Sequence, residues 1–443
     1  MPRIFSPSQP WVAFALLLAA GAIFVVRGPY RALRDSEDFA SPYSSAKCWV
    51  AGLNPYQQAN IDREYRRAGG VPIDAQSLQS LPTVFAPVYP PSTFVLVSTL
   101  AGTDWKTAKI VWMTINTLSF LASILLLLKS AYNRSRQLAL YLLAFCLLFA
   151  PVQTGIAKGQ PSVLAICLLT AALYLPVFPR RDLIAGLLVG LSCCIKPQIA
   201  LPFFLYWIWR RQWGVIGASI GVVILAWAVA LPSLIHGSPT WASDWLSTLQ
   251  SATGPGTSFD PTFRNVSTYQ LVNFQSAVGF FTDKTVVCNL VTYALIAGLI
   301  ALILALKHPL AQQPWLILGL LPVLILFGSY HRYYDLQLLL LCIGGLVLVD
   351  WSGRRGLLGG LLAVVACLSV PLQAAAARAY SLPSLGDKLK EGGRTLQFIA
   401  LHHQPCCLLA IALMFAWLIV VSPSGQYAGS GAKPPAHEPQ RGY

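Results

Sequence analysis

Residues 213–232 read WGVIGASIGVVILAWAVALP, and this stretch decides the fold class. It holds no charged residue, and a helix of about 20 residues spans about 30 Å, the thickness of a bilayer's hydrocarbon core. Similar apolar runs recur along the chain from Trp11 to Val421. They are continuous rather than alternating, which favours helices over a membrane barrel. The sequence therefore predicts an all-α integral membrane protein.

Composition supports the same class. The 443 residues are 56% hydrophobic and only 11% charged, with a mean hydropathy of +0.60, too apolar for the surface of a soluble domain. The net charge of +15 does not indicate a nucleic-acid partner, because Lys and Arg occur as pairs and triplets in short loops between apolar runs. The ten cysteines lie mostly inside those runs without CxxC spacing, so we expect small hydrophobic residues rather than a metal site.

One polytopic domain, residues 1–421, is expected to contain the membrane helices, followed by a disordered cytoplasmic tail at 422–443, rich in Gly, Pro and Ser. About twelve transmembrane helices are predicted, at 11–26, 108–128, 137–153, 161–178, 183–195, 198–209, 213–232, 286–306, 314–329, 334–349, 356–373 and 403–421.

Two large loops separate these spans, at 27–107 and 233–285. In the first, Ser44 to Val50 and Ile61 to Arg67 have the spacing of amphipathic helices at a membrane surface. Tyr89 to Ala101 is apolar but too short to cross a bilayer, so it is predicted to re-enter or dip into the membrane.

Charge assigns the sides of the membrane. Short basic loops such as Arg180/Arg181 and Arg210/Arg211 are expected to be cytoplasmic. By alternation, both large loops lie on the extracytoplasmic face of a multi-pass plasma-membrane protein. The arginines after the first span favour the opposite side for loop 27–107, but long loops translocate largely regardless of charge.

A cluster of acidic residues, Asp35, Glu37 and Asp38, directly follows the first span. Neighbouring carboxylates near a membrane raise one another's pKa, and such a group can act as a general base. The alternative interpretation is a solvated helix cap, since Asp and Ser are common at that position.

Cations are predicted on the same face. Lys196 precedes Pro197 between two apolar runs, His331 and Arg332 lie between two others, and Arg264 lies in loop 233–285. Cations at membrane depth usually have an anionic partner, and a lipid phosphate is one candidate. The alternative is snorkelling of these side chains to headgroups.

Two further polar residues fall at the edges of apolar runs. Gln160, in the Gly159-Gln160-Pro161 turn, has an amide suited to a sugar hydroxyl, although a helix cap accounts for it equally well. Tyr89 belongs either to a substrate site or to the aromatic belt of the membrane interface.

Several short motifs resemble those of glycosyltransferase family 87, in the family's order. They are Asp38-Phe39 with Tyr43, Ala46 and Gly52-Leu53-Asn54-Pro55-Tyr56, then Val88-Tyr89-Pro90-Pro91, Gly159-Gln160, Lys196-Pro197 with Arg210-Arg211-Gln212-Trp213, and Asn265-Val266-Ser267. The resemblance covers about residues 10 to 350. It implies a helix bundle of the GT-C type. The family includes polyprenyl-phosphate-mannose-dependent α-mannosyltransferases.

What this resemblance implies is transfer of a hexose from a polyprenyl-phosphate sugar to a lipid or glycan acceptor. The family's catalytic aspartate falls on Asp38, with Asp35 as the second candidate, and its functional histidine on His331. Tyr89, Gln160, Lys196, Arg264, Asn265 and Arg332 are then expected to bind substrate. The partners expected are membrane lipids, the donor and the acceptor, and neither a cofactor nor a metal is required.

Two other functions fit the same apolar pattern. A transporter or flippase of lipid-linked sugars usually has internal repeats and polar groups near the midplane, whereas here the polar groups gather at one rim. A polymerase or ligase of lipid-linked glycans would share that rim but use other acceptors. We therefore expect a carboxylate and several cations, distant in sequence, to meet in one extracytoplasmic pocket.

Overall fold

The computed structural model describes residues 10–71, 87–174, 181–305, 314–343, 346, 355–381 and 393–421. Their regular structure is helical throughout, and within these ranges the one β-bridge joins Leu271 to Arg332. The predicted all-α class is therefore confirmed. The tail at 422–443 lies outside the described residues.

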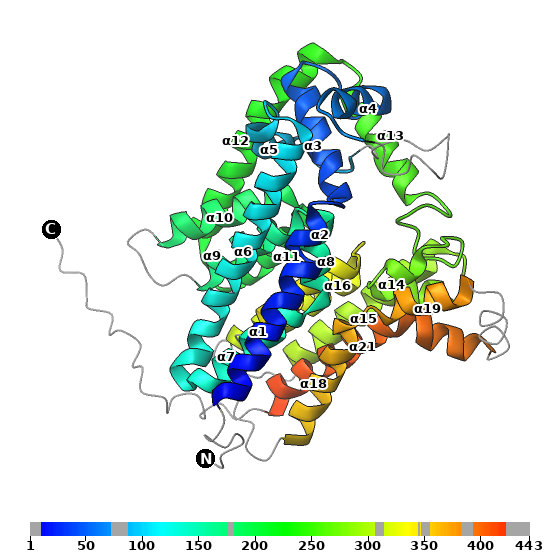
Figure 1. Ribbon diagram of the computed structural model, residues 1–443. Helices are drawn as coiled ribbons and strands as arrows, with labels where there is room; N and C mark the ends of the chain where they lie inside the picture. Colours follow the sequence, from blue (N-terminus) through cyan, green and yellow to red (C-terminus); the bar gives the residue numbers. More distant parts are fainter. Residues whose placement is uncertain are drawn as a thin grey trace.

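Five stretches of the described chain are long and apolar enough to cross a membrane. They contain α1 (Pro10–Arg27), which opens the stretch Trp11–Val50, and α6 (Trp105–Arg134), α12 (Trp213–Gly237), α15 (Thr285–Ala305) and α21 (Gly393–Val421). Figure 1 shows α1 running beside α6 and α7 (Arg136–Leu148). A total of about twelve spans remains a prediction.

Over the predicted span 137–153 the chain forms two helices, α7 and α8 (Ala150–Lys158), which together are long and apolar enough to cross a membrane but are bent by 47°. Pro151 explains the break. A proline has no N–H for the carbonyl four residues earlier, here that of Leu147, and its ring crowds that carbonyl. The Gln153 side chain replaces the missing donor, since its Nε2 donates to the Leu147 carbonyl at 2.7 Å.

Most other predicted spans coincide with shorter helices. These are α9 (Ser162–Tyr174), α10 (Arg181–Ile195), α11 (Pro197–Trp209), α16 (Pro314–Gly328) and α18 (Arg355–Ser369). The predicted span 334–349 differs, because its start forms a 3₁₀ helix, η4 (Tyr333–Leu341), rather than an α-helix. The predicted final span begins earlier than expected, and α21 has a kink at His402, ahead of Pro405.

The first loop folds into short helices, and those that follow the first of them lie toward one end of the molecule (Figure 1). They are α2 (Pro29–Ala32), α3 (Glu37–Val50), α4 (Gln58–Arg67), α5 (Pro91–Val97) and the 3₁₀ turn η1 (Ser98–Leu100). Both predicted amphipathic segments are helical. However, Ser44 and Ser45 of α3 are fully buried, so this part of α3 packs inside the protein. Stacked aromatic rings, including Phe39 on Trp112 at 4.5 Å, join α3 to α6.

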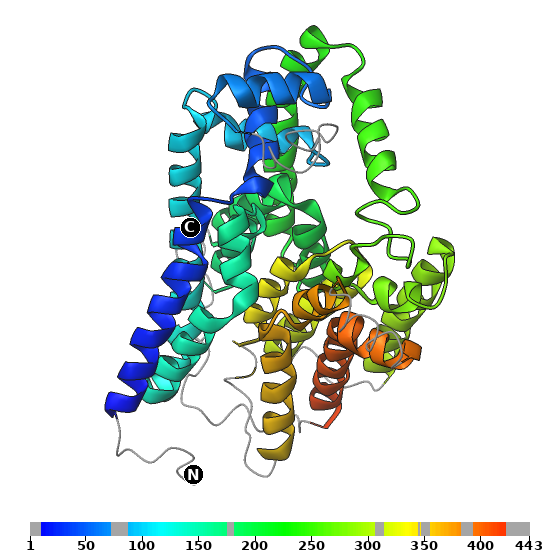
Figure 2. The ribbon, with the colours of Figure 1, turned by 45° about the vertical axis from the view of Figure 1, so that its right-hand side comes forward.

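The second loop contains α13 (Trp241–Thr253), the turn η2 (Thr268–Gln270) and α14 (Phe274–Gly279). Figure 2 shows α13 leading away from the end of α12 and returning the chain toward α14 and α19 (Leu372–Ser381). No residue of α13 is fully buried.

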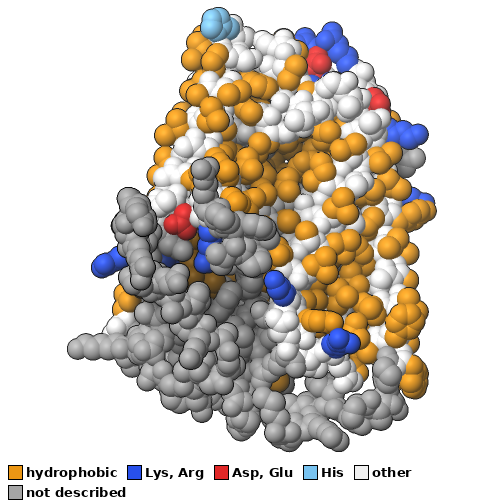
Figure 3. Space-filling model, turned by 90° about the vertical axis from the view of Figure 1, so that its left-hand side faces the viewer, with side chains coloured by type: hydrophobic (Ala, Val, Ile, Leu, Met, Phe, Trp, Pro, Cys, Tyr) orange, Lys and Arg blue, Asp and Glu red, His pale blue; other side chains and the backbone are white. Residues whose placement is uncertain are grey.

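The surface is strongly apolar. Figure 3 shows hydrophobic side chains covering much of the described part of one face. On α12, Ile224 and Leu225 are 62% and 65% exposed, which suits contact with lipid rather than water. All ten cysteines are free, as expected for small hydrophobic residues.

Candidate functional site

The turn at Gly159 brings Asp38 next to Gln160. Gly159 has a φ of +69°, and a Cβ at this position would lie 2.9 Å from the Cβ of Phe39, so only glycine allows α8 to approach α3 this closely. The backbone N–H of Ser36 donates to the Ala157 carbonyl at 3.0 Å, and Lys158 pairs with Glu37. The first turn of α3 is therefore fixed to the end of α8.

The backbone also turns sharply just before Asp38. Ser36 has a φ of 46°, in the left-handed region that residues other than glycine seldom adopt. Its hydroxyl donates to the Ala32 carbonyl at 2.7 Å, which holds the turn between α2 and α3. Such strained residues cluster at functional sites.

The Asp38 side chain lies beyond the apolar helix α1, in the first turn of α3, and the residue is half-buried. Burial raises the pKa of its carboxyl above the ordinary value. The Gln160 amide and the positive charges of Arg332 and Lys196 oppose this rise, which shows that these groups lie around it. Asp38 thus has the setting of a proton acceptor with a raised pKa.

Lys196 is held at a helix break. Pro197 disfavours a helical conformation in the preceding residue, and Lys196 adopts φ −147° and ψ 80° between α10 and α11. The hydroxyl of Thr93 donates to the Cys194 carbonyl at 2.8 Å, so α5 packs against the end of α10. The predicted break at this position is confirmed.

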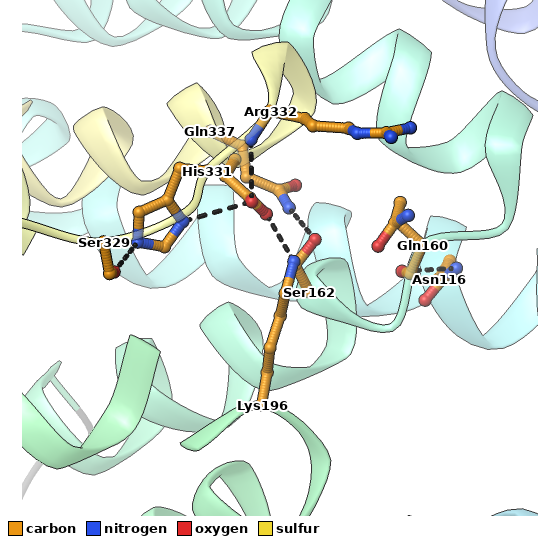
Figure 4. Close-up of polar contacts among 9 residues, drawn as sticks. Asn116, Gln160, Ser162, Lys196, Ser329, His331, Arg332 and Gln337 are labelled. Atoms are coloured by element: carbon orange, nitrogen blue, oxygen red, sulfur yellow. Dashed lines mark hydrogen bonds and ion pairs between the residues drawn. The ribbon is translucent and has the colours of Figure 1, made fainter. Parts of the chain in front are cut away.

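Asp335 connects Lys196 to His331. The Lys196 ammonium lies 2.8 Å from one carboxylate oxygen, and Nδ1 of His331 lies 3.1 Å from the other. Nε2 of His331 lies 3.0 Å from the Ser329 hydroxyl. All three members of the cluster Lys196–Asp335–His331 are buried. In Figure 4, Lys196 and His331 point toward the same carboxylate from different elements.

Arg332 extends away from that cluster. Its backbone N–H donates to Asp335 at 3.3 Å, while in Figure 4 its side chain points to the side on which Gln160 lies. The guanidinium lies over the Tyr330 ring, 5.7 Å from its centroid. No described carboxylate forms an ion pair with it, and its buried Nε has no hydrogen-bond partner. This leaves a cation able to bind an anion.

Two buried amide oxygens at the Gly159-Gln160 turn have no partner within the described part of the chain. Oε1 of Gln160 and Oδ1 of Asn116 are buried without a partner, although Nδ2 of Asn116 donates to the Gln160 carbonyl at 3.2 Å. Buried polar groups are normally paired, so each orphan is a potential substrate contact. Tyr89 faces the same region. Burial and the charge of Asp38 raise the pKa of its hydroxyl, which keeps it neutral and able to donate.

Three predicted residues have their described contacts elsewhere. Asp35 pairs with Arg31 at 2.7 Å. Arg264 pairs with Asp283, and the Asn265 side chain donates to the Asp260 carbonyl at 3.0 Å within its own loop. Their roles in substrate binding remain predictions.

Asp335 is the residue that the sequence analysis missed. It lies inside the predicted apolar span 334–349, so its carboxylate does not stand out in the sequence as a partner for Lys196. The available signal is its position four residues after His331 in the same short polar stretch, and in the structure the two side chains meet at the turn that opens η4. Within the described residues, no group of three or more His, Cys, Asp or Glu side chains is placed to hold a metal ion.

The arrangement can accept a proton at Asp38 and bind an anion at Arg332, and the Gln160 amide beside Asp38 has a free oxygen for a hydroxyl group. These are the requirements of group transfer between an alcohol and a phosphate-bearing substrate.

Comparison with known proteins agrees with this chemistry. The family model of glycosyltransferase family 87 matches residues 88–328, more than half of the chain. The chain therefore belongs to glycosyltransferase family 87 and is a glycosyltransferase. The match begins after Asp38 and ends before His331, so it does not itself assign these two residues. No curated protein and no solved structure matches the chain.

Proposed function

We propose that the protein transfers a hexose, in the first instance mannose, from a polyprenyl-phosphate sugar to a hydroxyl of a lipid or glycan acceptor. The site lies on the extracytoplasmic face of the plasma membrane, in a GT-C type bundle of about twelve spans. One observation carries the proposal. Asp38 and Arg332 lie within electrostatic range of each other, yet neither forms an ion pair with the other or with another described residue. We place the substrate between these two side chains.

The reaction is a single displacement. The acceptor oxygen attacks the anomeric carbon and its proton passes to the Asp38 carboxylate. The bond from the anomeric carbon to the phosphate oxygen breaks, and polyprenyl phosphate leaves with the electron pair. The attack occurs opposite the leaving group, so the configuration inverts, as with the base of an inverting glycosidase. Phosphate is already a good leaving group, so no acid, cofactor or metal is needed for its departure.

Arg332 is the group we assign to the phosphate. Its guanidinium has a buried Nε without a hydrogen-bond partner among the described residues, and charge-assisted hydrogen bonds to phosphate are stronger than neutral ones. Lys196 and His331 were predicted to share this role. Because Asp335 already binds both, we propose that they act through it, by fixing the backbone N–H of Arg332. Gln160 and Tyr89 are proposed to bind sugar hydroxyls.

The test compares Asp38→Asn with the wild type and with Asp35→Asn. Purified protein receives labelled polyprenyl-phosphate mannose or polyprenyl-phosphate glucose, with membrane lipid extract as acceptor. A lost general base costs about 10²–10⁴-fold in rate, so we expect this loss in Asp38→Asn. Asp35→Asn should remain near wild type, since Asp35 pairs with the exposed Arg31. Equal transfer by Asp38→Asn would reject Asp38 as base, and transfer from neither donor would reject the donor class.

A further inference from the structure

Asn54, in the sequence Asn54-Pro55-Tyr56, uses both ends of its side-chain amide. It is only 3% exposed. Its Oδ1 accepts from the backbone N–H of Tyr56 at 3.0 Å. Its Nδ2 donates to the Ser238 hydroxyl at 3.0 Å and to the Asp244 carboxylate at 2.6 Å. One buried side chain thus joins the first loop to the start of α13, about which the sequence motif alone says nothing.

The first connection runs through Tyr56. The Oδ1 contact fixes the backbone at Tyr56, whose hydroxyl donates to the Tyr89 carbonyl at 2.9 Å. The Tyr56 ring also packs against Phe94 of α5, with centroids 5.5 Å apart. Tyr89 in turn lies within electrostatic range of Asp38.

The second connection runs through α13. Asp244 is held by Asn54, and the next residue, Trp245, donates from its indole N–H to the Val88 carbonyl at 3.5 Å. The Trp245 ring also stacks on Tyr56, with centroids 5.9 Å apart. Both connections therefore end on the dipeptide Val88-Tyr89.

Close backbone packing makes this junction stiff. A Cβ at Gly237 would lie 2.2 Å from the Gly52 carbonyl oxygen, so the end of α12 touches the first loop directly. Beyond this point α13 has no buried residue, and its contacts with the first loop include the Trp245 ring on Tyr56 and the hydrogen bond of Asp244 with Asn54.

We propose that Asn54 is a positioning residue for sugar transfer, which holds Val88-Tyr89 beside Asp38 through Tyr56 on one side and α13 on the other. This role rests on the proposed function. Small displacements of groups that orient a substrate reduce the rate strongly, because reacting atoms must approach within about 3–3.5 Å.

Asn54→Asp is the sharpest variant. It has the same shape and keeps the oxygen that accepts from Tyr56, but it places a second carboxylate against Asp244. We expect kcat to fall at least tenfold, with a smaller change in the KM for donor. The double variant Asn54→Asp with Asp244→Asn restores a donor and an acceptor in exchanged places, and kcat should return to within about threefold of wild type.

Gln57→Glu is the matched control. Its Nε2 donates to the same Asp244 oxygen at 3.2 Å, but the contact is exposed. The same change of amide to carboxylate is screened by water there, so kcat should stay near wild type. Tyr56→Phe provides a second route, because it removes only the hydroxyl bonded to the Tyr89 carbonyl; kcat should fall severalfold.

Hydrogen-exchange mass spectrometry of a peptide covering residues 87–97 gives a readout that does not need activity. Exchange should rise in Asn54→Asp and return to wild-type protection in the double variant. Wild-type exchange in Asn54→Asp, or unchanged kcat in both Asn54→Asp and Tyr56→Phe, overturns the positioning role. Failure of the double variant to recover also overturns it. If the wild type transfers no sugar, the proposed function fails, and the exchange result still decides the role of Asn54.

Discussion

The two sides of the site differ in how well their polar groups are satisfied. On one side, Lys196, Asp335 and His331 bind one another, and Asp335 also accepts from the backbone of Arg332. On the other side, and among the residues that the structure describes, Gln160 and the Arg332 guanidinium retain buried atoms without partners and the Asp38 carboxylate forms no ion pair. A fully paired buried network stabilises a conformation, whereas orphaned groups are free to bind a ligand. We therefore assign a supporting role to Lys196, Asp335 and His331, the paired side. We assign substrate binding to Asp38, Gln160 and Arg332, the unpaired side.

The largest effect is expected on stability, from breaking the buried ion pair between Lys196 and Asp335. In Asp335→Asn the buried Lys196 ammonium loses its counter-charge, and breaking a buried ion pair costs about 3–5 kcal/mol. The thermal unfolding midpoint, measured in one detergent, should fall sharply.

The control for this prediction removes both charges. In Asp335→Asn combined with Lys196→Met, no unpaired charge remains, so most of the lost midpoint should return. A single variant as stable as wild type would mean that the pair is not a supporting element.

The sequence was sufficient where a single local cause determines structure. The uncharged run 213–232 became α12, and Lys196-Pro197 became a break between two helices. It was insufficient where apolar composition hid a local cause or a distant partner. Pro151 divides a run that otherwise looks continuous, and Asp335 lies in a run that looks like a plain span.

The same division applies to the site. Asp38, Gln160 and Arg332 come from distant segments, and the structure brings them together as expected from their polar positions at the rims of apolar runs. The pairing of Lys196 with Asp335 joins residues 139 positions apart, which no local pattern reveals. Arg264 has a nearby partner in Asp283, a competing contact within the loop that charge alone could not exclude.

The unpaired side is tested first by Arg332→Gln, which keeps a polar side chain but removes the charge. Hydrogen bonds to charged groups contribute about 1.5–3 kcal/mol, so kcat/KM for the donor should fall about 10- to 100-fold. Inhibition by added polyprenyl phosphate should weaken in parallel. Arg67→Gln is the matched control, since its exposed guanidinium pairs with Glu64, and it should stay near wild type. If both variants lose affinity equally, Arg332 has no special role at the phosphate.

The smallest effect is expected from Gln160→Leu, and it is best seen in a pH profile. Asp38 must be ionised to accept a proton, so kcat/KM rises with pH through the pKa of its carboxyl in the free enzyme. Burial raises that pKa and Gln160 lowers it, so removing the amide raises the pKa further. The acid limb of kcat/KM should therefore move to higher pH, with about a three- to tenfold loss of rate on that limb from one hydrogen bond.

Gln153→Leu separates this effect from simple loss of a buried amide. Gln153 is 1% exposed and also has an orphaned oxygen, but its donor contacts the Leu147 carbonyl at the break between α7 and α8. Its loss should lower stability and leave the acid limb in place. A limb that moves equally in both variants would show that general loosening, rather than the Gln160 amide, sets the protonation of Asp38. If the acid limb of kcat/KM does not move in Gln160→Leu, the Gln160 amide does not act on the Asp38 carboxyl.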